Sequence, residues 1–341
     1  MTDPVTQTYT PPVEGESPLV GRHSRTRKIV VGTLTVALLL IPLIRGYASY
    51  NYILQVLTVI FMWTAMTSSW NILGGYTGYI SLGHNVFFAA GGYVSGMLLL
   101  EFGWSPFATA ALSGVVALLL GGLAGLITYR THGPSFIIST IALLLVVTLL
   151  LDNWEYLGGS NGISLPLPPF EQAWLKVPFY YSMLVAAILA VMLGYRVQHS
   201  KFGLALRAIA EDEVKAETSG IDTRRFKLMA FALSAFFPGV VGALWGYSLA
   251  YLRPVIFLLI AVAARMVLMA IVGGRGTVAG PVIGAILVVL FDEAAITFFG
   301  ANELNLVITG ALLVLMLLFF PLGIVGTLRN HHRLPSWLDW D

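Results

Sequence analysis

Uninterrupted apolar runs, each close to the length that a helix needs to cross a bilayer, occupy most of the chain. A hydrocarbon core of about 30 Å takes roughly 20 helical residues to span. Only helices and closed barrels satisfy their backbone polar groups in lipid, and continuous rather than alternating runs favour helices. Charged residues make up 11% of the 341 residues, against roughly 25% in soluble domains. We therefore expect an all-α integral membrane protein.

Ten runs are predicted to span the membrane. They are Ile29–Ile44, Tyr52–Leu73, Asn85–Leu100, Phe107–Tyr129, Ser135–Leu151, Tyr180–Val197, Leu228–Tyr251, Val255–Val272, Val278–Phe299 and Leu304–Phe320. The third run is short and follows a Gly-rich stretch, so a broken or re-entrant helix is expected there. With the amino terminus in the cytoplasm, 15 of the 19 Lys and Arg residues fall on the cytoplasmic side, as the positive-inside rule requires. Both termini are then cytoplasmic.

The chain divides into a polar, disordered tail over residues 1–28, a transmembrane domain over 29–328 and a tail over 329–341. An acidic outer loop covers residues 152–178, and a densely charged inner loop covers 198–227. Loops of this length carry function or are disordered.

The inner loop has a helical pattern. Glu211–Ser219 is predicted to form a short helix in which Glu211 and Lys215 are spaced to pair, and Gly220 suits the left-handed position that ends a helix. Glu213, Ala216, Glu217 and Gly220 share one face of it, where another surface could approach closely. From the spacing alone, the segment is either a docking surface or a solvated charged loop.

Several classes of function are excluded by what the sequence lacks. A net charge of +2 is too small to indicate a nucleic-acid partner. With no Cys there is no thiol nucleophile or Cys-based metal site. Neither a Walker-type phosphate loop nor a His-Glu-x-x-His metal helix occurs. We therefore expect no enzyme activity and no cofactor in this chain, and the few acidic residues within the spans argue against a proton-driven carrier.

Two Gly-rich segments are similar to each other. Gly74–Gly78 follows the second span and Gly273–Thr277 follows the eighth. The similarity hints at duplicated halves, which are common in transporters. Chance explains it equally well, because the chain has 35 Gly residues.

The stretch Gly74–Gly83 has two interpretations. Small residues let helix backbones pack closely in lipid without any role in transport. Alternatively, a broken helix here lines a translocation pathway and presents backbone groups to a polar solute. Ser81, His84 and Asn85 would then be its polar side chains.

Arg265 lies near the middle of the eighth predicted span. A charge at that depth is costly unless it is paired or faces a wet cavity. It is therefore a candidate pathway residue that attracts a substrate carboxylate, or it forms a structural ion pair with Asp292 or Glu293 of the next span.

Motifs in a fixed order then identify a resemblance to a known family. They are Asn71–His84, Phe87–Tyr93, Gly133–Phe136, Asn153–Trp154, Gly158–Ile163, Phe202–Ile221, Lys227–Ser234, Gly273–Pro281 and Pro321–Ile324. Together they make the chain similar to LivM-type permease subunits of ATP-binding-cassette importers for branched-chain amino acids. Asn85 departs from the small residue that this family places there.

The resemblance implies a multi-pass subunit of the bacterial cytoplasmic membrane that forms the translocation pathway. Its partners would be ATPase subunits that bind ATP and Mg, a second permease subunit of the LivH type, and an extracytoplasmic substrate-binding protein. The inner loop would be the segment that docks on the ATPase, and its coupling residues would be Glu211, Asp212, Glu213, Ala216 and Gly220. Two alternatives stay open: a urea or short-amide importer, and an ATP-independent carrier or channel.

Overall fold

The computed structural model describes residues 32–33, 35–43, 50–171, 174–300, 310 and 323–330. Within them the chain forms η1 (Ile41–Leu43), α2 (Tyr50–Gly74), α3 (Asn85–Phe102), α4 (Pro106–Thr128), α5 (Pro134–Asp152), η2 (Glu155–Leu157), η3 (Gly159–Asn161), β1 (Ile163–Ser164), α6 (Lys176–Gln198), α7 (Lys201–Glu211), α8 (Glu213–Thr218), α9 (Thr223–Leu249), β2 (Tyr251–Leu252), α10 (Pro254–Leu258), α11 (Ile260–Gly273), α12 (Ala279–Phe299) and α14 (Gly323–Asn330). The strands of this described part make one short antiparallel pair, in which Ile163 lies opposite Leu252.

Eight helical segments in the described residues are long and apolar enough to cross a membrane. They are α2, α3, α4, α5, α6, α9, α10 continued by α11, and α12. They match the second to ninth predicted spans, which confirms an all-α membrane protein. The first predicted span is described only in part, with helix over residues 35–40. Residues 304–320, apart from Gly310, and both predicted tails, apart from Arg329 and Asn330, lie outside the described residues.

The centre of the bundle is built on α2 and α9, the two most buried spans, whereas α5 is the most exposed. α9 packs against α3 and α4, and α2 packs against α6 and α9. The crossing of α3 and α9 is very close, because a Cβ atom on Gly242 would lie 1.9 Å from the carbonyl oxygen of Phe88. Small residues at such crossings let helices pack by direct backbone contact in lipid.

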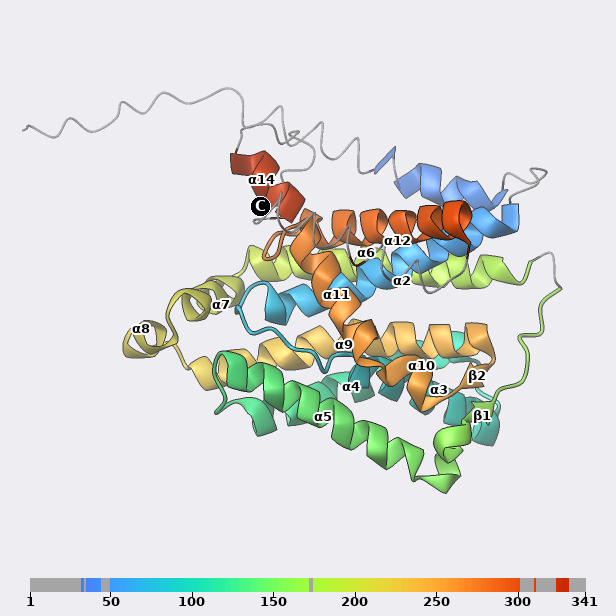
Figure 1. The fold of residues 1–341 in the computed structure, drawn as a ribbon, viewed down its shortest axis with the longest axis horizontal. Coiled ribbons are helices and arrows are strands. Elements are labelled where there is room, and N and C mark those ends of the chain that lie inside the picture. Colours follow the sequence, from blue (N-terminus) through green and yellow to red (C-terminus); the bar gives the residue numbers. More distant parts are fainter. Residues whose placement is uncertain are drawn as a thin grey trace, which may run out of the picture.

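The ends of the bundle differ (Figure 1). α7 and α8 lie at one end, on the left of the view, and the β1–β2 pair lies at the other end. Because α7 and α8 come from the inner loop, the left end is the side predicted to be cytoplasmic.

The Gly-rich stretch interrupts the helices between α2 and α3. Residues 75–84 form turns and extended chain, and α3 is continuous from Asn85 onward. The indole Nε1 of Trp70 donates to the carbonyl oxygen of Ser81 at 2.9 Å. Since Trp70 lies one turn before the end of α2, the chain reverses and runs back beside that helix. The predicted interruption therefore precedes the third span and does not break it.

Asn71 joins the two Gly-rich segments that resemble each other. Its Nδ2 donates to the carbonyl oxygen of Thr277 at 2.9 Å, and its Oδ1 accepts from the backbone N–H of Gly276 at 3.0 Å. The two segments therefore lie against each other at one end of the bundle.

Candidate functional site

The inner loop folds into two helices with a sharp bend at Asp212. Asp212 has extended backbone angles, φ −161° and ψ 107°, and its Oδ1 accepts from the backbone N–H of Lys215 at 3.1 Å. This is the N-cap arrangement that short polar side chains favour. The predicted helix over Glu211–Ser219 therefore begins only after the bend, as α8. Lys215 pairs with Asp212 at 3.2 Å, so the predicted pairing of Glu211 with Lys215 is wrong: the bend separates the two residues.

Gly220 has a φ of +88°, which confirms the left-handed position predicted for it. No atom of the described residues lies within 4 Å of a Cβ built on it, so within this part of the chain it faces open space. Ala216 is buried, whereas Glu211 is exposed and Val214 is 71% exposed. The predicted common face of this helix is thus divided, with Ala216 turned toward the bundle and Gly220 turned away from it. The sequence pattern did not indicate that the apolar side chain of Val214 would be exposed.

A surface pocket lies between α7 and α8. Its walls are formed by Ala208, Glu211, Asp212, Lys215, Ala216, Ser219 and Ile221. Three of the predicted coupling residues, Glu211, Asp212 and Ala216, therefore meet at one depression on the surface of the inner loop.

Glu213 turns inward instead. Its Oε1 accepts from Nζ of Lys227 at 2.6 Å, and its Oε2 accepts from the hydroxyl of Tyr79. His132 Nε2 lies 3.5 Å from the same Oε2. The side chains of Lys227 and Glu213 are only 8% and 16% exposed. From the sequence pattern, Glu213 was predicted to be one of the docking residues. The pattern did not indicate these partners, which come from segments far apart in the chain.

The charge state of Glu213 follows from these contacts. Burial by itself raises the pKa of the Glu213 carboxyl, but hydrogen bonds from Lys227 and Tyr79 together hold this pKa below its usual value. Burial, and then the hydrogen bond to Glu213, raise the pKa of Tyr79. Near neutral pH the pair is therefore a carboxylate and a neutral phenol that donates to it.

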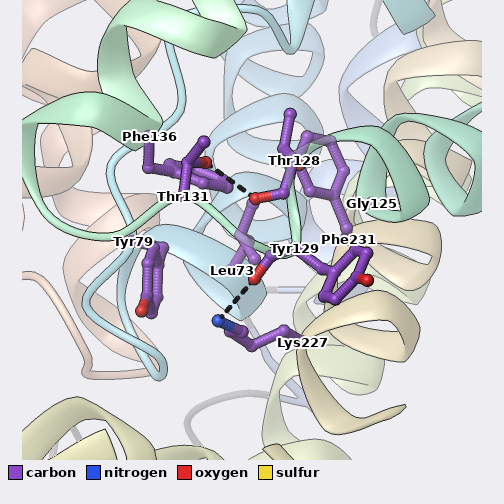
Figure 2. A pocket seen from close by; sticks show the side chains of 9 residues that line it. All are labelled: Leu73, Tyr79, Gly125, Thr128, Tyr129, Thr131, Phe136, Lys227 and Phe231. Carbon is purple, nitrogen blue, oxygen red and sulfur yellow. Dashed lines mark hydrogen bonds between the residues drawn. The ribbon is translucent and has the colours of Figure 1, made fainter. Parts of the chain in front are cut away.

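Lys227 also reaches the turn between α4 and α5. Its Nζ donates to the carbonyl oxygen of Tyr129 at 3.1 Å and lies 4.8 Å from the centre of the Tyr79 ring. Figure 2 shows Lys227 donating to Tyr129 beside a small cavity that Tyr79 also lines. Lys227 thus holds together α9, the α4–α5 turn and the segment 75–84.

Ser81 and His84 form one fully buried network with α9. His84 Nδ1 lies 2.9 Å from Oγ of Ser81, and Nε2 lies 2.8 Å from Oγ of Ser234. The His84 ring also stacks on Phe231 with a centroid distance of 5.3 Å. The two candidate pathway residues are therefore brought together, and both ring nitrogens of His84 have partners inside the protein.

Asn85 contacts a different part of the bundle. Its Nδ2 donates to the carbonyl oxygen of Leu259 at 3.0 Å, while its buried Oδ1 has no partner in the described part of the chain. Leu259 has φ −59° and ψ 128° and separates α10 from α11. The eighth predicted span is thus two helices, and the apolar run, which contains no Gly at this point, did not reveal the break.

Arg265 forms the ion pair that was one of its two predicted roles. Its guanidinium binds the carboxylate of Asp292 on α12 and lies 5.6 Å from the ring of Trp63. The Arg265 side chain is 40% exposed. Glu293 accepts instead from the hydroxyl of Tyr52 at 2.9 Å.

At the opposite end, the outer loop is tied to the end of α9. Arg253 Nε donates to the carbonyl oxygen of Ser160 at 3.1 Å, next to the β1–β2 pair. Among the described residues, no group of three or more His, Cys, Asp or Glu side chains is arranged to hold a metal ion.

Comparison with known proteins gives one family. Residues 52–317 match the family described as "Branched-chain amino acid transport system / permease component". The chain is 28% identical to the high-affinity branched-chain amino acid transport system permease protein LivM of Escherichia coli (strain K12) over 328 residues, covering 88% of this chain and 76% of the relative.

Two further relatives carry similar names. The permease protein LivH of the same organism and system is 28% identical over 272 residues, covering 74% of this chain and 87% of LivH. The permease protein BraD of Pseudomonas aeruginosa is 26% identical over 300 residues, covering 81% and 96% of the two chains. No solved structure matches the chain.

Proposed function

Since this chain belongs to the family of branched-chain amino acid transport system permease components, we propose that it forms the translocation pathway of an ATP-binding-cassette importer for branched-chain amino acids. The observation that carries the proposal is the match to this family over residues 52–317, which includes the helices α2 to α12 and the inner loop. The relatives are multi-pass transport subunits and not enzymes, so ATP and Mg belong on separate ATPase subunits.

The ATPase subunit docks on α7 and α8. These helices extend beyond the spans at the end of the bundle predicted to be cytoplasmic (Figure 1). Exposed Val214 and Gly220 offer an apolar contact and an open backbone, and the pocket at Glu211, Asp212 and Ala216 offers a depression beside them.

The pathway runs along the face of α11 that carries Arg265. Leu259 and Ile260 are 49% and 46% exposed at the break before α11. The first N–H groups of a helix have no partner within it, and such groups do not face lipid. A guanidinium that is 40% exposed in a span does not face lipid either. This face therefore borders a wet pathway, shared with a second permease subunit of the LivH type.

The amino-terminal end of α11 suits an amino acid as the transported solute. Helix amino termini attract carboxylates through free N–H groups and the helix dipole. The Oδ1 of Asn85, which has no hydrogen-bond partner among the described residues, is an acceptor close to the same end, because the amide of Asn85 binds Leu259. An extracytoplasmic binding protein delivers the solute at the end of the bundle that carries β1 and β2.

The protein lies in the bacterial inner membrane, and both of its chain termini lie in the cytoplasm.

Affinity-tagged chain purified from its native membrane tests the proposal. We expect ATPase subunits and a second permease to copurify, and the complex in proteoliposomes to take up labelled leucine only with ATP and the binding protein. Uptake of urea or short amides in place of leucine would favour the urea-type importer. Solute accumulation by this chain alone, without nucleotide, would favour a carrier and contradict the proposal.

A further inference from the structure

We infer that Glu213, held by Tyr79 and Lys227, is the connection through which movement of α8 reaches the segment 75–84 and the membrane pathway. The inference rests on the proposed function, because α8 moves only if an ATPase subunit binds it. It separates Glu213 from the docking residues of the inner loop and assigns it a positioning role.

Glu213 makes the polar side-chain attachment of α8 to the rest of the described bundle. The side chains of Asp212 and Thr218 bond to Lys215, within the bend and α8 itself. Among the described residues of α8, Glu213 is the one whose side chain makes polar contacts to other elements, namely Tyr79 before α3, Lys227 of α9 and His132 after α4. A displacement of α8 therefore acts on Tyr79 and Lys227 through this carboxylate.

The connection is hard to break. Charge-assisted hydrogen bonds are roughly twice as strong as neutral ones, and separating a buried ion pair leaves an uncompensated charge. With the side chains of Lys227 and Glu213 only 8% and 16% exposed, pulling Glu213 away would strand Lys227 in the bundle. We expect α8, Lys227 and Tyr79 to move together.

The segment 75–84 can carry that movement further. It has no helical hydrogen-bond ladder to break, and Tyr79 is separated from Ser81, His84 and Asn85 by only a few residues. His84 is bonded to Ser234 in the middle of α9, and Asn85 is bonded to Leu259 at the start of α11. The route from Glu213 therefore ends at the break before α11, on the helix that carries Arg265.

Tyr79→Phe tests the inference most directly. It removes the hydroxyl that joins the segment 75–84 to Glu213 but leaves the Glu213–Lys227 pair and the phenyl ring in place. Tyr52→Phe is the matched control, because the hydroxyl of Tyr52 also donates to a carboxylate, that of Glu293 at 2.9 Å, away from the inner loop. Both variants are assembled with the ATPase, the second permease and the binding protein in proteoliposomes, and leucine uptake is measured together with ATP hydrolysis.

For Tyr79→Phe we expect normal assembly and a drop of at least about fivefold in leucine transported per ATP hydrolysed, the lower end of typical coupling strengths. Tyr52→Phe should keep the wild-type ratio. An unchanged ratio in Tyr79→Phe would overturn the inference, and so would loss of the ATPase from a folded Tyr79→Phe complex, since that would make Tyr79 a docking determinant.

A second variant keeps the test decisive if Tyr79→Phe does not reach the membrane. Glu213→Asp retains the charge against Lys227 but shortens the reach to Tyr79, and the same loss of coupling is expected. Failure of the proposed function gives a different result, because the wild-type chain would then copurify with no ATPase and show no ATP-dependent uptake.

Discussion

His84 Nε2 and Ser234 Oγ lie 2.8 Å apart in the middle of the bundle, where both side chains are fully buried. This contact joins the non-helical segment before α3 to the centre of α9, two parts of the chain that are 150 positions apart. The segment 75–84 thus stays close to α9 through a specific hydrogen bond in addition to apolar packing.

Ser234→Ala should destabilise the protein by about 1–2 kcal/mol, because it leaves a buried ring nitrogen of His84 without a partner. The loss is read as a lower unfolding temperature of the purified protein in detergent. Ser248→Ala is the control on the same helix: Ser248 is exposed and bonds only to the carbonyl oxygen of Trp245. Equal unfolding temperatures for the two variants would show that the His84–Ser234 contact contributes nothing.

Arg265 and Asp292 give a prediction that separates structure from transport. Asp292→Leu alone leaves the guanidinium of Arg265 unpaired in a span, so it should lower the unfolding temperature more than the double variant Arg265→Leu, Asp292→Leu. The double variant should regain much of the stability. It should nevertheless take up leucine at least about tenfold more slowly, because a tenfold loss corresponds to about 1.4 kcal/mol of lost interaction with the solute. Wild-type uptake by the stable double variant would remove Arg265 from the pathway.

The sequence predicted the spans well because lipid imposes a simple rule. Any chain that crosses the hydrocarbon core needs a continuous apolar helix, and the described spans follow the apolar runs to within a few residues of their predicted ends. The left-handed Gly220 was predictable for a different, local reason, since few residues other than Gly adopt a φ of +88° at low cost.

The contacts of the site were not predictable in this way. Glu213 lies on a densely charged loop, and nothing local shows that its partners come from Tyr79 and Lys227, which are 134 and 14 positions away. The break at Leu259 was hidden for a similar reason: α10 and α11 are both apolar, and the break is held by Asn85 from another part of the chain. Tertiary packing decides both features.

The pH dependence of stability should report the Glu213–Lys227 pair. Burial raises the pKa of Glu213, but Lys227 and Tyr79 hold it below its usual 4.5 in the folded protein. The stabilisation is therefore fully present above the usual value and is lost as the pH falls through the lower, folded-state pKa. Glu213→Gln, which resembles the protonated form, should unfold at a lower temperature than wild type near neutral pH.

That difference should shrink as the pH is lowered below about 4.5, and unfolding curves in detergent at a series of pH values measure it. Glu217→Gln should follow the wild-type curve at every pH, because Glu217 is exposed on the same helix. A difference that widened with falling pH would contradict a depressed pKa for Glu213.

Gly220 provides the test of docking on the inner loop. Gly220→Trp places a large side chain in the open space outside α8 and should abolish copurification with the ATPase while leaving membrane insertion intact. Gly220→Asn controls for the backbone, because Asn adopts the left-handed conformation more readily than other residues with a side chain and adds far less bulk than Trp, so its complex should assemble. Glu213→Arg should also lose the ATPase, but indirectly: a second cation against Lys227 releases α8 from the bundle. A full complement of ATPase on Gly220→Trp would show that this face of the loop is not the docking surface.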